Sequence, residues 1–384
     1  MSENVILKGI TWNHSRGFVP MTATAQRFSE LNPGVNITWE KRSLQQFADL
    51  SIQQLARVYD LLVIDHPWAG FAAKTDSILP FDQYLSKEFL EDQKLNTVGH
   101  SYESYNYDGR QWALAIDAAT PVASSRPDLF EKFKITLPET YNDLIALAKQ
   151  GLVACPLIPI DSLMTFYTFC ASLGEDPCQQ DDTVISKETG VKALQLYRGL
   201  AELVNPVCFN RNPIQIYEAM TLGDDIAYCP FAYGYSNYSR NGYARKLLYF
   251  HDMITLNGTS NLRSSLGGTG LAVSSNCRHA DLAMQYAEYV ASARCQAGLY
   301  TDNGGQPGHL AAWTDAGNNA KTHNYFSSTL PALHRAYLRP RYLGHMFFQD
   351  HAGDIVRNYL MNGGDELTVL QQMDDIYRQS KQQV

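Results

Sequence analysis

The alternation of strand-like and helix-like segments near the N-terminus restricts the fold of this chain more than any other feature. Residues 5–13 (VILKGITWN) read as a strand, and residues 20–31 carry apolar side chains at helical spacing before Asn-Pro-Gly ends that helix. A second strand at 35–41, a second helix at 44–57 and a third strand at 60–65 (DLLVID) follow. This β-α-β-α-β order predicts a parallel sheet covered by helices.

Polar and aromatic residues directly follow the first and third of these strands. Trp12, Asn13 and His14 come after the first strand, and the third strand runs into Asp65, His66, Pro67 and Trp68. In an open parallel sheet, ligands bind beyond the carboxyl ends of the strands. The two loops are therefore predicted to share one rim and to form one wall of a ligand site.

Further strands and helices are predicted along the rest of the chain. Asp108-Gly109 is a hairpin signal. The Gly-rich stretch 266–275 (LGGTGLAVSS) is expected to be a turn, where Gly267 and Gly268 bend a strand or let the backbone approach a ligand. The remaining expected elements are a strand over 111–116, helices beginning near 126 and 138, a mainly helical region over 140–235 that ends in a strand, and helices from 280 onward.

Length and composition describe a globular protein with room for two domains. The chain has 384 residues, of which 45% are hydrophobic and 18% charged. Its formal charge of −8 argues against a nucleic-acid partner, because phosphate binding requires basic patches. No window holds the roughly 18 consecutive apolar residues of a membrane helix, so no membrane insertion is expected. The seven cysteines, an odd number without a repeating spacing, indicate no disulfide framework, and most are expected to be buried small hydrophobes.

The N-terminal sequence leaves the compartment open. MSENVILKGITWN enters a strand-like run almost at once and shows no basic region, apolar region or cleavage site of an export signal. If a signal was removed and Met1 added, the protein is expected to be periplasmic, or extracellular and lipid-tethered. If Met1 is the native start, it is expected to be cytoplasmic.

The sequence lacks the familiar motifs for catalysis and metal binding. It contains no HExxH, no paired CxxC, no GxSxG and no GxxxxGK[ST]. We therefore expect no enzyme activity, no metal and no cofactor. The cluster Tyr233, Tyr235 and Tyr238 leaves ferric-ion binding as an alternative, because paired tyrosinates bind ferric iron in some transport proteins.

The residue types near the predicted rim fit a sugar-like ligand. Indole and phenol faces stack on the apolar C–H face of a sugar ring, whereas carboxylates, amides and arginine bind its hydroxyl groups. A concave site with a few convergent polar groups suits such a ligand. The candidate binding residues are Trp12, Asn13, His14, Arg16, Asp65, His66, Trp68, Asp117, Tyr233, Tyr235, Gly268, Thr269 and Gln306.

Several stretches, in order, resemble the family 1 extracellular solute-binding proteins of ABC importers, which include maltose- and oligosaccharide-binding proteins. FSELNPGVNITWE is similar to the family's Phe-x-x-x-x-Pro-Gly helix end, and YNYDGRQWALAID to its Tyr-x-Gly-Lys-x-Tyr-x-Leu-Pro. RPDLFEKFKITLPETYNDLIALA, GGTGLAVSS and GGQPGHLAAW continue the resemblance. Ala115 stands where the family has proline, and Tyr141 where it has tryptophan.

This resemblance implies an α/β fold of the type II periplasmic-binding-protein kind. It implies two lobes, each a mainly parallel sheet flanked by helices, with the ligand cleft between them. By matching motifs, the lobes would be 1–115 plus 268–308 and 119–265 plus 311–384, with hinge crossings near 116–118, 264–268 and 307–312.

The resemblance also implies the substrate-binding component of an ABC importer. Such a protein is expected to be a monomer that reversibly clamps a carbohydrate-like solute, performs no chemistry on it and delivers it to permease subunits. The alternatives that stay open are a cytoplasmic solute sensor or binding protein, an enzyme on the same scaffold, and a binder of a small carboxylate or ferric ion. The carboxylate alternative rests on His14 and Arg16, which could hold an anion.

Overall fold

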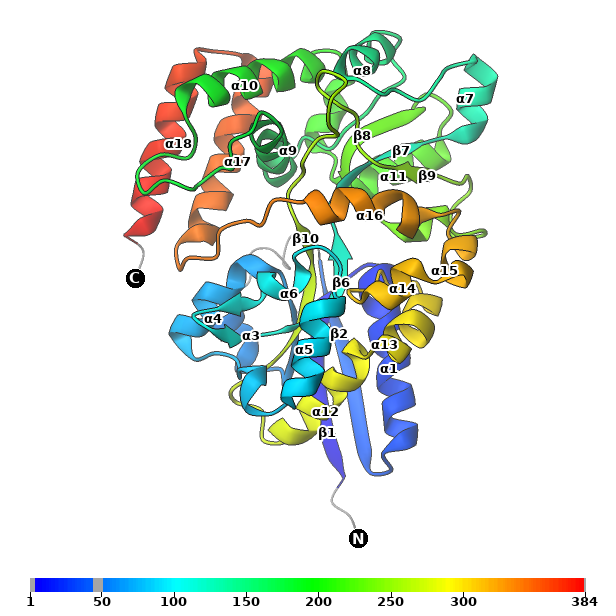
Figure 1. Ribbon diagram of the computed structural model, residues 1–384, viewed down its shortest axis with the longest axis vertical. Coiled ribbons are helices and arrows are strands. Elements are labelled where there is room, and N and C mark those ends of the chain that lie inside the picture. The colour runs from blue at the N-terminus through cyan, green and yellow to red at the C-terminus, as the bar shows by residue number, and fades with distance from the viewer. Residues whose placement is uncertain (1–3, 44–50, 383–384) are drawn as a thin grey trace. The chain divides into compact units, whose positions relative to one another are not determined.

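The three N-terminal strands predicted from the sequence form side by side in the computed structural model of the protein, which describes residues 4–43 and 51–382 (Figure 1). β1 (Val5–Trp12) pairs in parallel with both β2 (Val35–Arg42) and β3 (Leu61–Ile64), as predicted. The helix α1 (Ser15–Leu31) connects β1 to β2. The second predicted helix appears as α3 (Ile52–Ala56), and its first part, 44–50, lies outside the described residues.

The Gly-rich stretch predicted to be a turn is instead the strand β10 (Gly267–Val273), so this prediction was wrong. β10 pairs antiparallel with β3 on one side and with β6 (Leu114–Ala119) on the other, which gives the sheet order β2-β1-β3-β10-β6. A strand that is buried on both faces lacks the alternation of polar and apolar residues that identifies a strand with one face in solvent. The pairing register of β10 with β6 shifts between Thr269 and Gly270.

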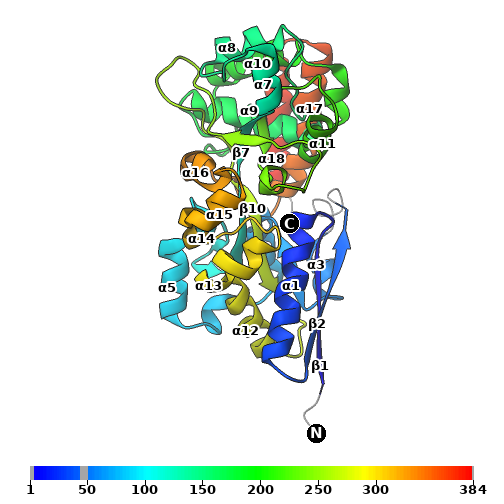
Figure 2. The same cartoon turned by 90° about the vertical axis from the view of Figure 1, so that its right-hand side faces the viewer.

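One face of this sheet is covered by α1 and α12 (Ala280–Ala291) (Figure 2). Met21, Ala25 and Phe28 of α1 are buried at helical spacing and belong to the same apolar core as the strands. Phe28 meets Tyr286 of α12 edge to face, with 5.3 Å between ring centroids. This packing holds α1 against the sheet, and α1 begins at Ser15, shortly after the end of β1 at Trp12.

The described chain divides into two compact units. Unit 1 comprises Met1–Ala119, Gly267–Ala320 and Arg341–Leu343, and unit 2 comprises Thr120–Leu266, Lys321–Pro340 and Gly344–Val384. The changes of unit at 119/120 and 266/267 fall beside two of the predicted crossings. Residues 309–320, assigned from the sequence mostly to the second lobe, pack within unit 1, where Trp313 Nε1 donates to Pro307 O at 2.6 Å. The role of these crossings as hinges stays a prediction.

The remaining elements of unit 1 are short and surround the sheet. The hairpin predicted at Asp108-Gly109 is confirmed, with φ of +50° and +74° at these two residues. The elements are η1 (His66–Trp68), α4 (Ala69–Thr75), η2 (Phe81–Gln83), α5 (Lys87–Asn96), α6 (Ser101–Ser104), β4 (Asn106–Tyr107), β5 (Arg110–Gln111), α13 (Ala293–Cys295), η5 (Gln296–Tyr300), α14 (Leu310–Thr314) and α15 (Ala316–Lys321).

Unit 2 has a smaller sheet, and its strand direction corrects the prediction of a mainly parallel sheet in each lobe. β7 (Pro121–Ser125) pairs antiparallel with both β8 (Tyr228–Tyr233) and β9 (Tyr249–His251). The parallel rule applies to a strand-helix-strand unit, whereas the long chain between β7 and β8 leaves their relative direction free. The helices of unit 2 are α7 (Pro127–Phe133), α8 (Tyr141–Ala148), α9 (Pro159–Ser172), α10 (Lys187–Ala201), η3 (Pro206–Asn210), α11 (Pro213–Leu222), η4 (Ser236–Ser239), α16 (Tyr325–Arg335), α17 (His345–Asn362) and α18 (Glu366–Lys381).

Two further predictions concern the whole chain. All seven cysteines are buried free thiols, as predicted. Within residues 4–43 and 51–382, no helix has both the length and the apolar character needed to cross a membrane.

Candidate functional site

The shortest charged contact among the predicted site residues joins α1 to β6 in unit 1. Arg16 donates from Nε to Asp117 Oδ2 at 2.8 Å and from Nη2 to Asp117 Oδ1 at 2.5 Å, and the two residues are 4% and 1% exposed. Burial raises the pKa of Asp117, and the positive charge of Arg16 opposes that rise. The structure therefore brings two predicted ligand residues together as partners of each other.

The predicted loop after β1 is the start of α1. His14 is the N-cap residue, and its Nδ1 accepts a hydrogen bond from Arg16 N–H at 3.0 Å. Burial and the nearby Arg16 charge lower the pKa of His14 to about 3, so its ring is neutral at pH 7. Trp12 lies in the apolar core of unit 1, whereas Asn13 is exposed. Their contact with a ligand stays a prediction.

The predicted loop after β3 folds into the single turn η1. Asp65 caps this turn, because its Oδ1 accepts from His66 N–H at 2.9 Å and lies 3.3 Å from His66 Nδ1. His66 is fully buried, and Trp68 packs edge-on against Phe71 with 5.3 Å between ring centroids. Asp65 thus has a local structural role in addition to its predicted role toward a ligand.

A second group of predicted residues surrounds the end of β6. Gln306 is buried, and its Nε2 donates to Ala118 O at 2.8 Å while its backbone oxygen accepts from Ala118 N at 3.0 Å. Thr269 on β10 pairs with Asp117 in the sheet. The Thr269 hydroxyl is buried and has no hydrogen-bond partner among residues 4–43 and 51–382. Because a buried hydroxyl costs free energy until it is hydrogen-bonded, Thr269 is suited to take a hydrogen bond from outside the protein.

Gly268 holds this part of the site together through its backbone conformation. Its φ is +97°, and a Cβ atom there would lie 2.3 Å from Asp117 O and 2.8 Å from Ala118 Cα. We expect Gly268→Ala to destabilise unit 1 by about 2 kcal/mol or more, because both contacts are with backbone. Gly298→Ala is the matched control, since a Cβ at Gly298 has open space around it. Equal thermal midpoints for the two variants would contradict the expected strain at Gly268.

The predicted tyrosines belong to unit 2. Tyr233 ends β8, and its hydroxyl lies 2.9 Å from Ser265 Oγ, while Tyr235 is 5% exposed. Tyr238 is fully buried and donates to Glu218 Oε1 at 2.7 Å, and burial together with this bond raises its pKa. A protonated, hydrogen-bonded phenol is a poor iron ligand. Within the described part of the chain, no group of three or more His, Cys, Asp or Glu residues is placed to hold a metal ion.

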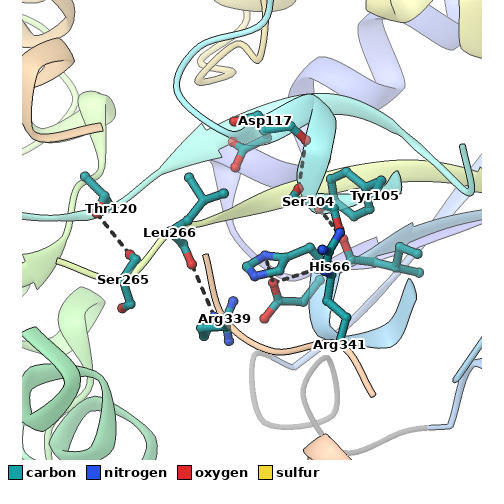
Figure 3. A network of polar contacts seen from close by, with 12 residues as sticks. His66, Ser104, Tyr105, Asp117, Thr120, Ser265, Leu266, Arg339 and Arg341 are labelled. Atoms are coloured by element: carbon teal, nitrogen blue, oxygen red, sulfur yellow. Dashed lines mark hydrogen bonds and ion pairs between the residues drawn. The ribbon is translucent and has the colours of Figure 1, made fainter. Parts of the chain in front are cut away.

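Two residues beside η1 in unit 1 were not found from the sequence (Figure 3). Tyr105 donates from its hydroxyl to Ile64 O at 3.2 Å, and its ring meets His66 edge-on at 6.4 Å. Arg341 donates from Nη1 to backbone oxygens of residues 103–106, the shortest at 2.5 Å. No local signal could have placed Arg341 here, because its partners lie at least 235 positions away in the sequence.

In unit 2, hydrogen bonds tie together the segments next to 120 and 266. Thr120 Oγ1 lies 2.6 Å from Ser264 Oγ and donates to Ser265 O at 3.0 Å (Figure 3). Arg339 is buried, and its Nε donates to Leu266 O at 3.2 Å. Hydrogen bonds therefore connect the two segments of unit 2 that adjoin the changes of unit at 119/120 and 266/267.

A family model described as bacterial extracellular solute-binding protein matches residues 12–297. The chain belongs to this family. The match confirms the resemblance inferred from the sequence, and its range contains every predicted binding residue except Gln306. Members of the family are extracellular binding proteins. Comparison with curated protein sequences gave no significant match.

Solved structures of solute-binding proteins share the fold of this family member over nearly its whole length. An ABC transporter solute-binding protein of Agrobacterium radiobacter K84, in complex with ribitol, is 18% identical with a TM-score of 0.83, covering 98% of this chain and 99% of that one. Maltose-bound MalE3 of T. maritima is 16% identical with a TM-score of 0.84, covering 97% and 99%. The tagatose-bound protein of Thermotoga lettingae TMO is 16% identical with a TM-score of 0.80, covering 98% and 99%. The predicted α/β periplasmic-binding-protein fold is thereby confirmed.

Proposed function

We propose that this chain is the substrate-binding component of an ABC importer and reversibly binds a neutral sugar or polyol. The observation that carries the proposal is the family match over residues 12–297, which includes the loops after β1 and β3 and the strand β10. A binding role also agrees with the chemistry of the candidate residues. Their polar groups offer hydrogen bonds, and among residues 4–43 and 51–382 no group of three or more His, Cys, Asp or Glu residues is placed to hold a metal ion.

The charges of unit 1 support a neutral ligand over a carboxylate. Arg16 and His14 were the residues that left an anionic ligand open. The Arg16 guanidinium donates hydrogen bonds to both carboxylate oxygens of Asp117. The low pKa of His14 keeps the imidazole ring of that residue uncharged. The buried Thr269 hydroxyl suits a hydroxyl partner. Ribitol, maltose and tagatose, the ligands of the three similar structures, are all neutral and polyhydroxylated.

Export and delivery belong to the same proposal. The family is extracellular, so we place the protein in the periplasm or tethered by a lipid outside the membrane. ABC permease subunits are the proposed partners, and a monomer suffices for this role.

A thermal-shift panel tests the ligand class. The protein is first refolded from denaturant to remove any ligand carried through purification. Ribitol, D-mannitol, tagatose, maltose, citrate and ferric citrate are then added separately. A ligand at about 100 times its dissociation constant adds roughly 2.7 kcal/mol of stability, so a clear rise in the melting temperature is expected from at least one sugar or polyol.

The same panel contains the outcomes that would contradict the proposal. A shift from citrate or ferric citrate alone would replace the neutral ligand by an anion or by iron. Conversion of a bound sugar, detected by mass spectrometry after overnight incubation, would show an enzyme. The expected result is a shift with the sugar or polyol recovered unchanged.

A further inference from the structure

A cavity of about 460 Å³ lies at one end of the unit 1 sheet and is lined by unit 1 alone. Ile78, one of its lining residues, bridges Ser274, which directly follows β10. The last residue of β10, Val273, pairs with Leu61, the first residue of β3. The cavity therefore lies at the amino end of β3, whereas the candidate residue His66 follows the carboxyl end of that strand. A ligand in this cavity would occupy a site distinct from the one proposed for a sugar or polyol.

The floor of the cavity is apolar. Ile78 and Trp112 are 2% and 5% exposed, and Pro80 is also buried. The Trp112 indole is held in place, because its Nε1 donates to Tyr107 O at 3.0 Å. A concave site of this volume, with an apolar floor and a few polar groups around it, suits a small organic molecule.

The two walls of the cavity carry exposed groups of opposite charge. Asp76, which directly follows α4 with φ of +49°, is exposed on one wall. Arg110 of β5 stands on the other wall, with its side chain 44% exposed. Arg110 Nη1 lies 4.0 Å from Asp82 Oδ2, which is beyond hydrogen-bond distance, so this ion pair leaves the guanidinium donors available to a ligand. Lys74 and Asp108, 3.0 Å apart, join the walls and balance each other's charge.

A zwitterion fits this distribution of charge better than an ion of either sign. A carboxylate accepts hydrogen bonds from an ammonium group, and a guanidinium donates two parallel hydrogen bonds to a carboxylate. A ligand with only a carboxylate would meet the negative charges of Asp76 and Asp82, and a ligand with only an ammonium group would meet the positive charge of Arg110. An α-amino acid carries both groups on one carbon atom, which leaves its side chain free to contact an apolar surface.

We propose that this cavity of unit 1 binds a free α-amino acid with an apolar side chain. Asp76 accepts hydrogen bonds from the ammonium group, Arg110 donates to the carboxylate, and the apolar side chain packs on Ile78 and Trp112. The inference goes beyond the proposed function and does not rest on it, because the cavity and the loop after β3 lie at opposite ends of that strand.

Calorimetric titration with L-valine, L-leucine and L-phenylalanine tests the inference. We expect saturable binding of at least one of them, and binding about tenfold weaker or worse for its amide and for the matching acid without the amino group. Asp76→Asn and Arg110→Gln should each raise the dissociation constant of the amino acid about tenfold or more, whereas Arg110→Gln should not weaken the amide further. Asp281→Asn and Arg294→Gln, at exposed positions of unit 1 outside the cavity, are the controls and should bind as wild type.

Folding and the identity of the site are checked in the same experiment. Asp76 and Arg110 are exposed, so both variants should keep the melting temperature of wild type. Excess maltose or D-mannitol should leave amino-acid binding unchanged, and displacement by either would overturn the inference, because the amino acid would then share the site of the sugar. The absence of saturable binding for all three amino acids would also overturn it, as would wild-type affinity in both Asp76→Asn and Arg110→Gln.

Discussion

Asp117→Leu is expected to destabilise unit 1 by about 3–5 kcal/mol, because it removes the buried carboxylate that is paired with the Arg16 guanidinium. Arg16→Leu should have an effect of similar size, since it leaves a buried carboxylate uncompensated. The double replacement removes both charges and should cost clearly less than the sum of the two single replacements. The pair is therefore expected to show a coupling energy of several kcal/mol in a double-mutant cycle.

Tryptophan fluorescence during urea unfolding measures this effect in unit 1 alone. All five tryptophans, Trp12, Trp39, Trp68, Trp112 and Trp313, belong to unit 1, so the signal does not include the unfolding of unit 2. The free energy of unfolding is obtained for wild type, both single variants and the double variant under one set of conditions.

A surface ion pair on the same helix provides the control. Arg27 and Glu30 of α1 are 2.8 Å apart and about half exposed, so their removal should change the unfolding curve little. Additive losses for the Arg16 and Asp117 single variants would contradict a coupled buried pair. So would a single variant as stable as wild type.

This pair also marks the limit of what the sequence could show about the site. Arg16 and Asp117 were both predicted to face a ligand, and the types of residue were informative. Their pairing was not predictable, because they are 101 positions apart and each side chain alone reads as an available charged group. Asp65 is a similar case, since a carboxylate at a strand end is equally suited to a ligand and to the cap of the following turn.

The fold was predictable where periodic patterns are local. β1, β2 and β3 follow from alternation and from the helix between them, and their parallel pairing follows from the connections. β10 was mistaken for a turn because glycines dominate its first half and burial on both faces hides any alternation. The direction of β8 against β7 depends on a connection too long for any simple rule.

The burial of Asp161, the third residue of α9, was not predictable for a different reason. An acid three positions into a helix that starts with proline is the usual pattern of an exposed first turn, where it favours the helix dipole. Only the packing of α9 shows that the carboxyl is buried and that its Oδ2 has no hydrogen-bond partner among residues 4–43 and 51–382. Burial of this kind depends on the tertiary structure, and no spacing in the sequence signals it.

The second large effect that we expect is a fall in the stability of unit 2 with rising pH that disappears in Asp161→Asn. The pKa of Asp161 is about 8 in the folded protein and 3.8 as an ordinary carboxyl. Below pH 3.8 the group is protonated in both states and costs nothing. Between pH 3.8 and 8 the unfolded chain is ionised while the folded protein holds the proton, so stability falls by up to about 1.4 kcal/mol per pH unit. Above pH 8 both states are ionised and the penalty is constant.

Hydrogen exchange of the α9 amides is the appropriate measurement, because unit 2 contains no tryptophan among its described residues. Wild type and Asp161→Asn are compared at each pH from 5 to 8, so that the intrinsic exchange chemistry cancels. Protection in the variant relative to wild type should grow by up to about 4 kcal/mol over this range. Asp354→Asn, on the exposed side of α17, removes one carboxylate elsewhere and should track wild type. Cys155, Cys229 and Tyr197 stay neutral throughout and contribute no slope. Parallel curves for wild type and Asp161→Asn would contradict the raised pKa and would mean that Asp161 is already ionised in the folded protein.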